Sequence, residues 1–306
     1  MNLDRLSAKA RNLNVRADVL ASLRAYFSAR GYLEVETPVR IPGPLTEAHI
    51  EAVTSDGAYL QTSPEVCMKP MLAAGYANIY QICKCFRHAE RGARHLPELT
   101  MLEWYTAGQD YAAMMTQCEE LVCYVARQLD RMDTLNYQGC SIDLTRPWQR
   151  VTVADAFKRL GSISMQQALR EGRFDEVMGL EIEPGLDCHR PVFLIDYPSS
   201  CGSLARLKPG NQELAERFEL YIGGLELCNA FSELIDPLEQ RQRFEQELQR
   251  RKTTGEVAYP LPDNFLAALS IMPEATGCAM GVDRLVMLMA DTDTIDAVVA
   301  FTPEDL

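Results

Sequence analysis

The stretch Leu99-Thr100-Met101-Leu102-Glu103-Trp104-Tyr105-Thr106 constrains the fold most, because it places a carboxylate inside an apolar segment. Its β-branched, aromatic and apolar residues predict a strand over 99–106. Side chains on a strand alternate between its two faces, so Glu103 shares a face with Met101 and Tyr105. A carboxylate between apolar neighbours is costly unless it is paired. Glu103 therefore indicates either an internal ion pair or a binding site for a cation.

A second acidic segment surrounds the dipeptide Gly223-Gly224, and its pattern predicts a hairpin over 217–234. If the glycines form a two-residue turn, Tyr221 pairs with Glu226, and Glu219 pairs with Cys228. Glu219 and Glu226 then project from one face within about 8 Å of each other. Two carboxylates that close repel unless a cation lies between them. Oxygen ligands beside phosphates are what Mg²⁺ prefers, so the pair is a candidate magnesium site.

The same hairpin predicts an irregularity in its second strand. Strict alternation places Asn229, Phe231 and Glu233 on the face opposite Glu226. If all four serve one site, a β-bulge near 227–229 must bring them to one face. We predict that bulge, and regular pairing through this stretch would refute it.

The remaining elements predict an α+β fold with a largely antiparallel β-sheet flanked by helices. Apolar periodicity and turn residues predict the following elements: strands over 79–86 and 275–281, and helices over 3–30, 110–130, 152–180 and 236–253 and from Asp283. No internal repeat or clear linker interrupts them.

Composition excludes several functional classes. The 306 residues are 47% apolar and carry a net charge of −13, from 30 basic and 43 acidic residues. No run of about 18 apolar residues suggests a membrane span, and the acidic balance argues against a protein that coats nucleic-acid phosphates. The ten cysteines form no C-x-x-C pair, and only four histidines are present. This argues against a zinc site and favours reduced thiols in a cytoplasmic protein.

Two arginines have settings that suit phosphate oxygens. Arg87 follows the strand at 79–86 where a charged loop begins, and Arg284 follows the Gly-rich strand at 275–281. A guanidinium fork binds two phosphate oxygens at once. Either arginine alone is also explained as a solvated surface residue. No glycine-rich nucleotide loop of the common types accompanies them.

The segments together resemble the class II aminoacyl-tRNA synthetases of the lysyl type. The matching stretches are Gly31-Tyr32-Leu33-Glu34-Val35-Glu36-Thr37-Pro38 for motif 1, Phe86-Arg87, Arg94-His95 and Thr100–Tyr105 for motif 2, Gly281-Val282-Asp283-Arg284-Leu285 for motif 3, and 217–234 for the metal and amino-acid contacts. This resemblance implies an ATP-dependent ligase that forms an aminoacyl-adenylate.

The resemblance assigns roles to individual residues. Arg87 and Arg284 would be catalytic, holding the α-phosphate and the γ-phosphate end of ATP, and Glu219 and Glu226 would hold Mg²⁺. The implied ATP contacts are Arg87, His88, Ala89, Glu90, His95, Leu96, Leu99, Glu226, Leu227, Gly281 and Arg284. The implied amino-acid contacts are Ser63, Pro64, Glu65, Glu103, Tyr105, Asn229, Phe231, Glu233 and Ala279.

Further features resemble the elongation factor P–(R)-β-lysine ligase family, the short paralogues of lysyl-tRNA synthetases. Thr62-Ser63-Pro64-Glu65 matches that family's pattern, and Ala279 stands where the synthetases have glycine. The 30 residues before motif 1 cannot hold an anticodon-binding OB-fold domain. The resemblance therefore implies one catalytic domain over 1–306 that forms a homodimer. Its implied substrates are β-lysine or lysine, and the implied acceptor is a lysine ε-amine of elongation factor P. Neither a tRNA nor a membrane partner is expected.

The chain departs from the family pattern in the adenine region, where Ala89 replaces an acid and Leu99 replaces an aromatic residue. Two alternatives accordingly stay open. One is a related lysine-activating ligase with another acceptor, such as a tRNA or a small molecule. The other is a catalytically weak paralogue that acts as a binding module.

Overall fold

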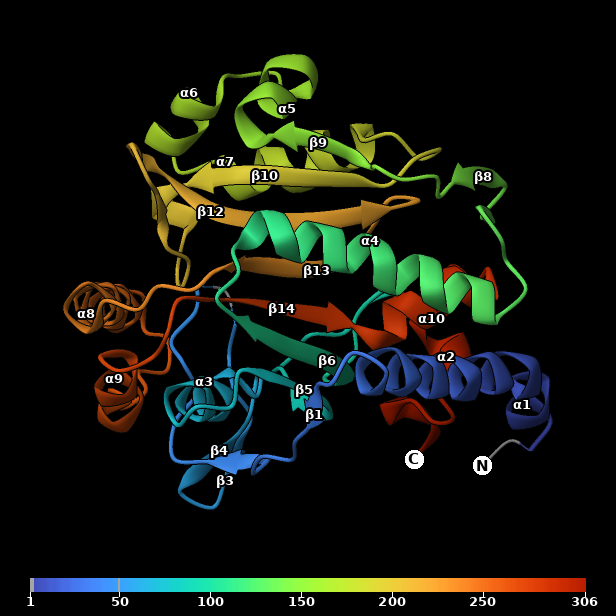
Figure 1. Cartoon of the computed structure of the whole chain (residues 1–306), viewed down its shortest axis with the longest axis horizontal. Helices are drawn as coiled ribbons and strands as arrows, with labels where there is room; N and C mark the ends of the chain where they lie inside the picture. Colours follow the sequence, from blue (N-terminus) through green and yellow to red (C-terminus); the bar gives the residue numbers. More distant parts are fainter. Residues whose placement is uncertain (1–2, 49) are drawn as a thin grey trace.

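The strand predicted at 99–106 lies within a nine-stranded sheet (Figure 1). The computed structural model describes residues 3–48 and 50–306. The strands of this sheet, in spatial order, are β1 (Leu33–Glu34), β5 (Asn78–Phe86), β6 (Glu98–Ala107), β14 (Ala275–Gly281), β13 (Leu225–Ser232), β12 (Asn211–Ile222), β10 (Val192–Pro198) and β9 (Gln149–Thr152), with β11 (Leu207–Lys208) beside β12.

The central strand pairs, from β5 to β10, are all antiparallel. The two outer pairs, β1 with β5 and β9 with β10, are parallel. The predicted α+β class with a largely antiparallel sheet is therefore confirmed. Two smaller sheets complete the described strands: β2 (Arg40–Ile41), β4 (Ala58–Leu60) and β3 (Thr54–Ser55), and the hairpin of β7 (Thr134–Tyr137) and β8 (Cys140–Asp143).

Helices cover the sheet. Their bounds are α1 (Leu3–Ala8), α2 (Ala10–Ser28), α3 (Glu65–Ala73), α4 (Tyr111–Gln128), α5 (Val153–Leu160), α6 (Met165–Arg170), α7 (Phe174–Val177), α8 (Pro237–Thr254), α9 (Asp263–Leu269) and α10 (Val282–Ala290). No helix among the described residues is long and apolar enough to cross a membrane.

The largest apolar core lies between one face of the sheet and helices α2, α4 and α10. Phe27 of α2, Val122 of α4 and Leu285 of α10 pack there with Trp104 of β6, and all are buried. Trp104 faces this core while Glu103 and Tyr105 line the opposite face, as the alternation in β6 predicts. The sheet thus has one apolar face and one face free to carry a site.

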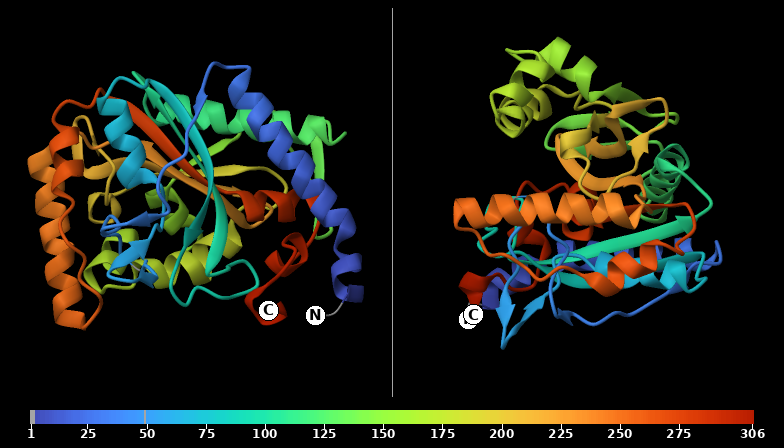
Figure 2. Two further views of the ribbon diagram at one scale, coloured as in Figure 1. Left: turned by 90° about the horizontal axis from the view of Figure 1, so that it is seen from below. Right: turned by 90° about the vertical axis from the view of Figure 1, so that its left-hand side faces the viewer.

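The other face of the sheet is bordered by α3, α8 and α9. Met68 of α3, Phe244 of α8 and Phe265 of α9 are buried together against Tyr105. Figure 2 shows α8 running along the edge of the molecule, beside this face. A separate cluster packs α5, α6 and α7 against β10, at the top of Figure 1.

Several predicted boundaries were wrong. The helix predicted over 3–30 breaks at Lys9, and the helix predicted over 152–180 is three short helices followed by a π-helical turn. The prediction also missed β10, which is buried on both faces between β9 and β12. A strand buried on both faces is a continuous apolar run without alternation, so periodicity alone does not separate it from a helix.

The predicted β-bulge is confirmed. Tyr221 pairs with Glu226, but Leu220 pairs with Cys228, so Leu227 is the extra residue on β13. The pairing predicted between Glu219 and Cys228 is wrong for the same reason, because the bulge places Asn229 opposite Glu219. The bulge brings Glu226 and Asn229 to the same face of the sheet.

Candidate active site

A cleft of about 1130 Å³ lies on the free face of the sheet. Its floor is formed by β6, β14, β13 and β12, and α8 borders one side. The cleft brings together most of the residues predicted for the site. Those that line it are Ser63, Glu65, Arg87, Glu90, His95, Leu96, Leu99, Glu103, Tyr105, Glu219, Glu226, Leu227, Asn229, Phe231, Ala279, Gly281 and Arg284.

Four predicted residues lie outside the lining. Glu233 is buried behind it, and Pro64 directly precedes α3. His88 turns toward Glu51, whose carbonyl accepts a hydrogen bond from the His88 backbone N–H at 2.7 Å. Ala89 has a left-handed backbone with φ of 58°. Their assignment to ATP or the amino acid stays a prediction.

Glu103 and Tyr105 form the deepest acidic corner of the cleft. The Tyr105 hydroxyl donates a hydrogen bond of 2.6 Å to Oε1 of Glu103, whereas Oε2 is buried without a hydrogen-bond partner among the described residues. Burial and the nearby Glu65 raise the pKa of Glu103 well above its usual range. No described basic side chain forms an ion pair with it. The internal ion pair offered as an explanation of Glu103 is thus not found, and its free oxygen suits a ligand cation.

Lys69 is a site residue that the sequence analysis missed. Its ammonium lies 2.5 Å from a carboxylate oxygen of Glu65 and 2.5 Å from one of Glu233. The side chain is fully buried, and although burial acts to lower the pKa of Lys69, the two carboxylates raise it overall. The available signal was its spacing, because a lysine four residues after Glu65 faces it on a helix.

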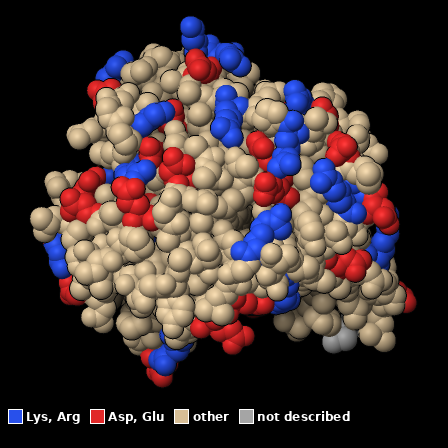
Figure 3. Space-filling view, viewed as in Figure 1, with Lys and Arg blue, Asp and Glu red and all other residues tan. Residues whose placement is uncertain are grey.

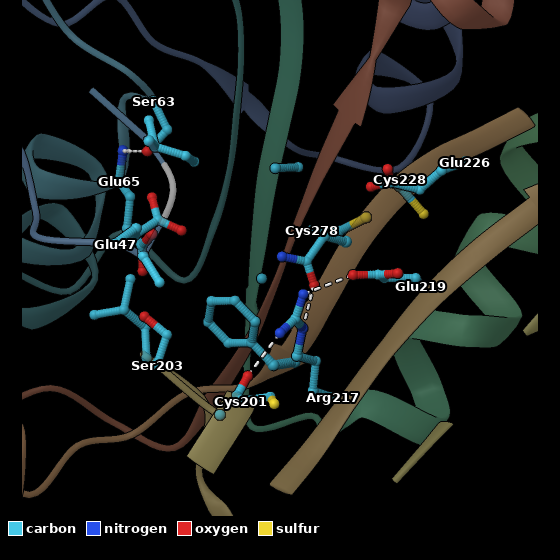
Figure 4. Close-up of a pocket in the computed structure, with 18 of the residues that line it drawn as sticks. Glu47, Ser63, Glu65, Cys201, Ser203, Arg217, Glu219, Glu226, Cys228 and Cys278 are labelled. Atoms are coloured by element: carbon cyan, nitrogen blue, oxygen red, sulfur yellow. Dashed lines mark hydrogen bonds and ion pairs between the residues drawn. The ribbon is translucent and has the colours of Figure 1, made fainter. Parts of the chain in front are cut away.

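The acidic end of the cleft holds more acidic side chains than Lys69 can pair with. Glu65, Glu103 and Glu233 provide three carboxylates, and Lys69 provides one ammonium. Glu47 adds a fourth acid beside Glu65 (Figure 4), and burial together with Glu65 raises its pKa to about 7. This end therefore favours a ligand with more than one positive charge.

Arg217 and Glu219 form a rigid network on β12 (Figure 4). One guanidinium nitrogen of Arg217 donates to Glu219 at 2.6 Å, and Nε donates to the Asn229 amide oxygen at 3.0 Å. The other oxygen of Glu219 accepts hydrogen bonds of 2.7 Å from the hydroxyls of Tyr197 and Tyr221. Arg217 was also missed as a site residue, although it begins the matching stretch 217–234, two residues before Glu219.

Arg284 and Glu226 lie at the opposite end of the cleft. Arg284 donates at 3.0 Å to the Glu226 carboxylate and at 2.8 Å to the Glu226 backbone carbonyl. Its other terminal nitrogen lies 2.6 Å from Nε2 of His95. Burial and the neighbouring Arg284 lower the pKa of His95, so the neutral imidazole accepts this hydrogen bond.

The carboxylates of this region fit a hard divalent cation. Burial raises the pKa of Glu183, and the nearby Glu219 and Glu226 raise it further. Glu219 and Glu226 therefore lie close enough to Glu183 to repel its charge, which a divalent cation would relieve, although Arg217 and Arg284 already pair with Glu219 and Glu226. Their donors are oxygens only, as Mg²⁺ requires. Glu183 is a third acid that the sequence analysis did not single out.

Comparison with known proteins gives consistent matches. A family model described as tRNA synthetases class II (D, K and N) matches residues 1–305. The chain is 37% identical to the elongation factor P–(R)-β-lysine ligase of Edwardsiella ictaluri, over 97% of this chain and 96% of that protein. The ligase of the same name from Erwinia tasmaniensis is also 37% identical to this chain. That match covers 97% of this chain and 96% of that protein.

The lysine–tRNA ligase of Moorella thermoacetica is 37% identical over 94% of this chain. The aligned region spans only 64% of that protein. The two groups of relatives thus differ in how much of their own length this chain matches.

Proposed function

The chain belongs to the class II tRNA synthetases (D, K and N), and on that premise we propose that it activates (R)-β-lysine or lysine with ATP and transfers it to elongation factor P. The acceptor group is a lysine ε-amine of that factor. The observation that carries the proposal is the acidic end of the cleft, where the single ammonium of Lys69 pairs with Glu65 and Glu233 and leaves Glu103 without a basic partner among the described residues. That charge suits an amino acid with two ammonium groups.

The reaction needs positioned charge and no acid–base residue. The substrate carboxylate attacks the α-phosphate of ATP, an aminoacyl-adenylate forms, and pyrophosphate leaves. Arg87 and Arg284 line the cleft, where they would hold phosphate oxygens and the charge that develops on them. Catalysis then comes from alignment and charge stabilisation.

Glu219 and Glu226, with Glu183 beside them, would hold the Mg²⁺ that accompanies ATP. Bound there, the ion would neutralise charge on the phosphates. The hydrogen bonds from Tyr197 and Tyr221 keep one Glu219 oxygen in place. Arg217 links Glu219 to Asn229, so the residues that would hold the cation and those that would contact the amino acid are held together.

The amino acid would lie between Glu103 and Glu65, over Ala279. Tyr105 orients Glu103, and Lys69 orients Glu65 and Glu233. Ala279 lies between Glu103 and Asn229 in the sheet, so its methyl group shapes the floor beneath the substrate. These residues supply recognition, and the arginines supply catalysis.

The choice of elongation factor P over tRNA rests on relatives of that name that match this chain along almost their full length. A tRNA acceptor is the second candidate, because a lysine–tRNA ligase is equally identical over the shared region. We further propose a single catalytic domain over 1–306, a homodimer formed through motif 1, and action in the cytoplasm, where a translation factor is modified. Sedimentation of the purified chain tests the dimer.

Lysine-dependent ATP–pyrophosphate exchange tests the activation step. We expect exchange with β-lysine or lysine, and we expect Glu103→Gln to lower kcat/KM for the amino acid at least about 30-fold, from the roughly 2–5 kcal/mol lost with one partner of a buried charge pair. Glu98→Gln is the matched control, since Glu98 lies on the same strand with its side chain 55% exposed.

Background exchange with both amino acids, from folded protein, would contradict the enzyme assignment. That result would favour the binding-module alternative raised by Ala89 and Leu99.

A further inference from the structure

Cys140, Cys188 and His189 meet at the edge of the molecule, away from the cleft. Cys140 begins β8, and the other two residues precede β10. The Cys140 sulfur lies 2.8 Å from the Cys188 sulfur and 3.2 Å from Nδ1 of His189. One potential ligand atom from each residue lies within 4.8 Å of the other two. A set of two thiols and an imidazole is typical of zinc sites.

The backbone around this cluster is fixed by hydrogen bonds. The His189 carbonyl accepts from the backbone N–H of Asp143 at 2.8 Å, and the His189 N–H donates to the Asp187 carboxylate at 2.8 Å. Asp187 in turn accepts from the Gln149 side chain at 3.0 Å. The three ligand-type side chains are therefore held at one place by elements far apart in the sequence.

The histidine ring is oriented for ligation through Nε2. Its Nδ1 lies 3.1 Å from the backbone carbonyl of Ser141, which can only accept, so a hydrogen bond between them requires the tautomer with the proton on Nδ1. In that tautomer Nε2 carries the free lone pair, and this atom lies 4.0 Å from the Cys140 sulfur. A ligating histidine that donates its other N–H to a backbone carbonyl is the usual arrangement around protein-bound zinc.

We propose that Cys140, Cys188 and His189 bind Zn²⁺ through two thiolate sulfurs and Nε2. Binding releases the two thiol protons, and the two thiolates neutralise the ion. Cys188 is exposed, so water can complete the fourth position. The sulfurs must separate by about 1 Å to reach the roughly 3.8 Å edge of a tetrahedron with 2.3 Å Zn–S bonds. The exposed Cys188 side chain can rotate to allow this.

The ion would join the β7–β8 hairpin to the segment that leads into β10. It would act as a structural clip, because the cluster is separate from the residues that line the cleft. The proposal does not rest on the ligase activity.

A second thiol cluster does not carry the same inference. Cys118 lies 3.9 Å from Cys228 and 3.8 Å from Cys278, sulfur to sulfur, and all three are buried in the main apolar core. Three thiolates around a divalent ion would leave a net negative charge in that core, which is costly. These cysteines are better explained as small core residues with weak thiol contacts.

Metal analysis of untagged protein tests the proposal. The protein is purified under reducing conditions without chelator, dialysed against Zn²⁺, and analysed for bound metal and protein. We expect about one Zn²⁺ per chain in the wild type and loss of most of it in Cys140→Ser and in His189→Ala. Cys83→Ser is the matched control, since Cys83 is also a partly buried strand cysteine beside another thiol, Cys85, and it should retain the metal.

Replacement of Zn²⁺ by Co²⁺ gives a second readout that does not depend on stoichiometry. The wild type and Cys83→Ser should show thiolate-to-cobalt charge-transfer absorption, and Cys140→Ser should show much less. Zn²⁺ retained by Cys140→Ser, a metal-free wild type after dialysis, or a Cys140–Cys188 disulfide recovered in place of bound metal would each overturn the proposal.

Discussion

Lys69 determines how much of the acidic end of the cleft is left for substrate. Its ammonium bridges Glu65 and Glu233 in the interior of the protein, where an unpaired charge would be costly. Glu103 has no such partner among the described residues. Lys69 thus supplies one internal cation beside Glu65 and Glu233, and on the proposed function a substrate ammonium would be the cation beside Glu103.

Removal of the Lys69 ammonium should strongly destabilise the protein. Lys69→Met leaves two buried carboxylates unpaired, which costs about 3–5 kcal/mol in the free energy of unfolding. Urea denaturation measures this loss. Lys84→Met is the control, because Lys84 pairs with Glu98 at the surface, where an ion pair contributes about 0–1 kcal/mol. Equal losses in the two variants would contradict the assigned role of Lys69.

His95 should make ATP binding weaken in acid. Burial and Arg284 lower the pKa of His95 below 6.5, so the folded state binds this proton less readily than the unfolded state. The favourable contribution of the neutral ring is present above pH 6.5 and is lost as the pH falls through the lowered pKa. A protonated ring also cannot accept the hydrogen bond from Arg284 and repels it.

We therefore expect the KM for ATP to rise as the pH falls through the lowered pKa of His95. His95→Gln keeps an acceptor that does not titrate and should flatten that rise. Steady-state kinetics across this range measure both. A wild-type KM that is constant down to pH 5 would contradict this role.

At the scale of elements, β14 can lie beside Glu233 and Tyr105 on the floor of the cleft only because Gly277 lacks a side chain. A Cβ there would lie 2.4 Å from a Glu233 oxygen and 2.4 Å from the Tyr105 ring. Gly277→Ala should cost about 1–3 kcal/mol of stability and raise the KM for lysine, because the ring and the carboxylate must shift. Gly179→Ala is the control, since a Cβ there meets nothing within 4 Å. Unchanged lysine kinetics in Gly277→Ala would contradict this account of the floor.

The sequence was most informative where chemistry and pattern conflicted. Glu226 and Asn229 could not share a face under regular alternation, and that conflict led to the bulge found at Leu227. Glu103 in an apolar strand likewise predicted a binding site, because an acidic side chain there is costly without a partner, and Glu103 does line the cleft. Both inferences depend on neighbours within one or two strands, which are visible in a sequence.

The features that were missed depend on contacts between distant segments. Lys69 contacts Glu233, which lies 164 residues later in the sequence. Cys140 lies beside Cys188 only because β8 packs against the segment before β10. The prediction of no zinc site considered short spacings, which cannot reveal such a cluster. The strand β10 was missed because its burial on both faces removes the alternation that identifies strands.

At the scale of the whole molecule, the net charge of −13 is distributed and not concentrated on the face shown in Figure 3. Acidic and basic side chains are interspersed there. Surface charges elsewhere in the described residues are also paired, as in Arg241 with Asp263 and Arg250 with Glu256. The net charge of −13 suits a protein acceptor better than a nucleic acid, whose phosphates attract a basic protein.

The acceptor is the central claim, and intact-mass analysis of elongation factor P tests it most directly. The purified factor is incubated with the enzyme, ATP, Mg²⁺ and either (R)-β-lysine or lysine, and tRNA is tested as acceptor in parallel. We predict that the factor gains the mass of one lysyl group, that the gain requires ATP, and that Glu103→Gln abolishes it while Glu98→Gln does not. An unmodified factor beside charged tRNA would contradict the account.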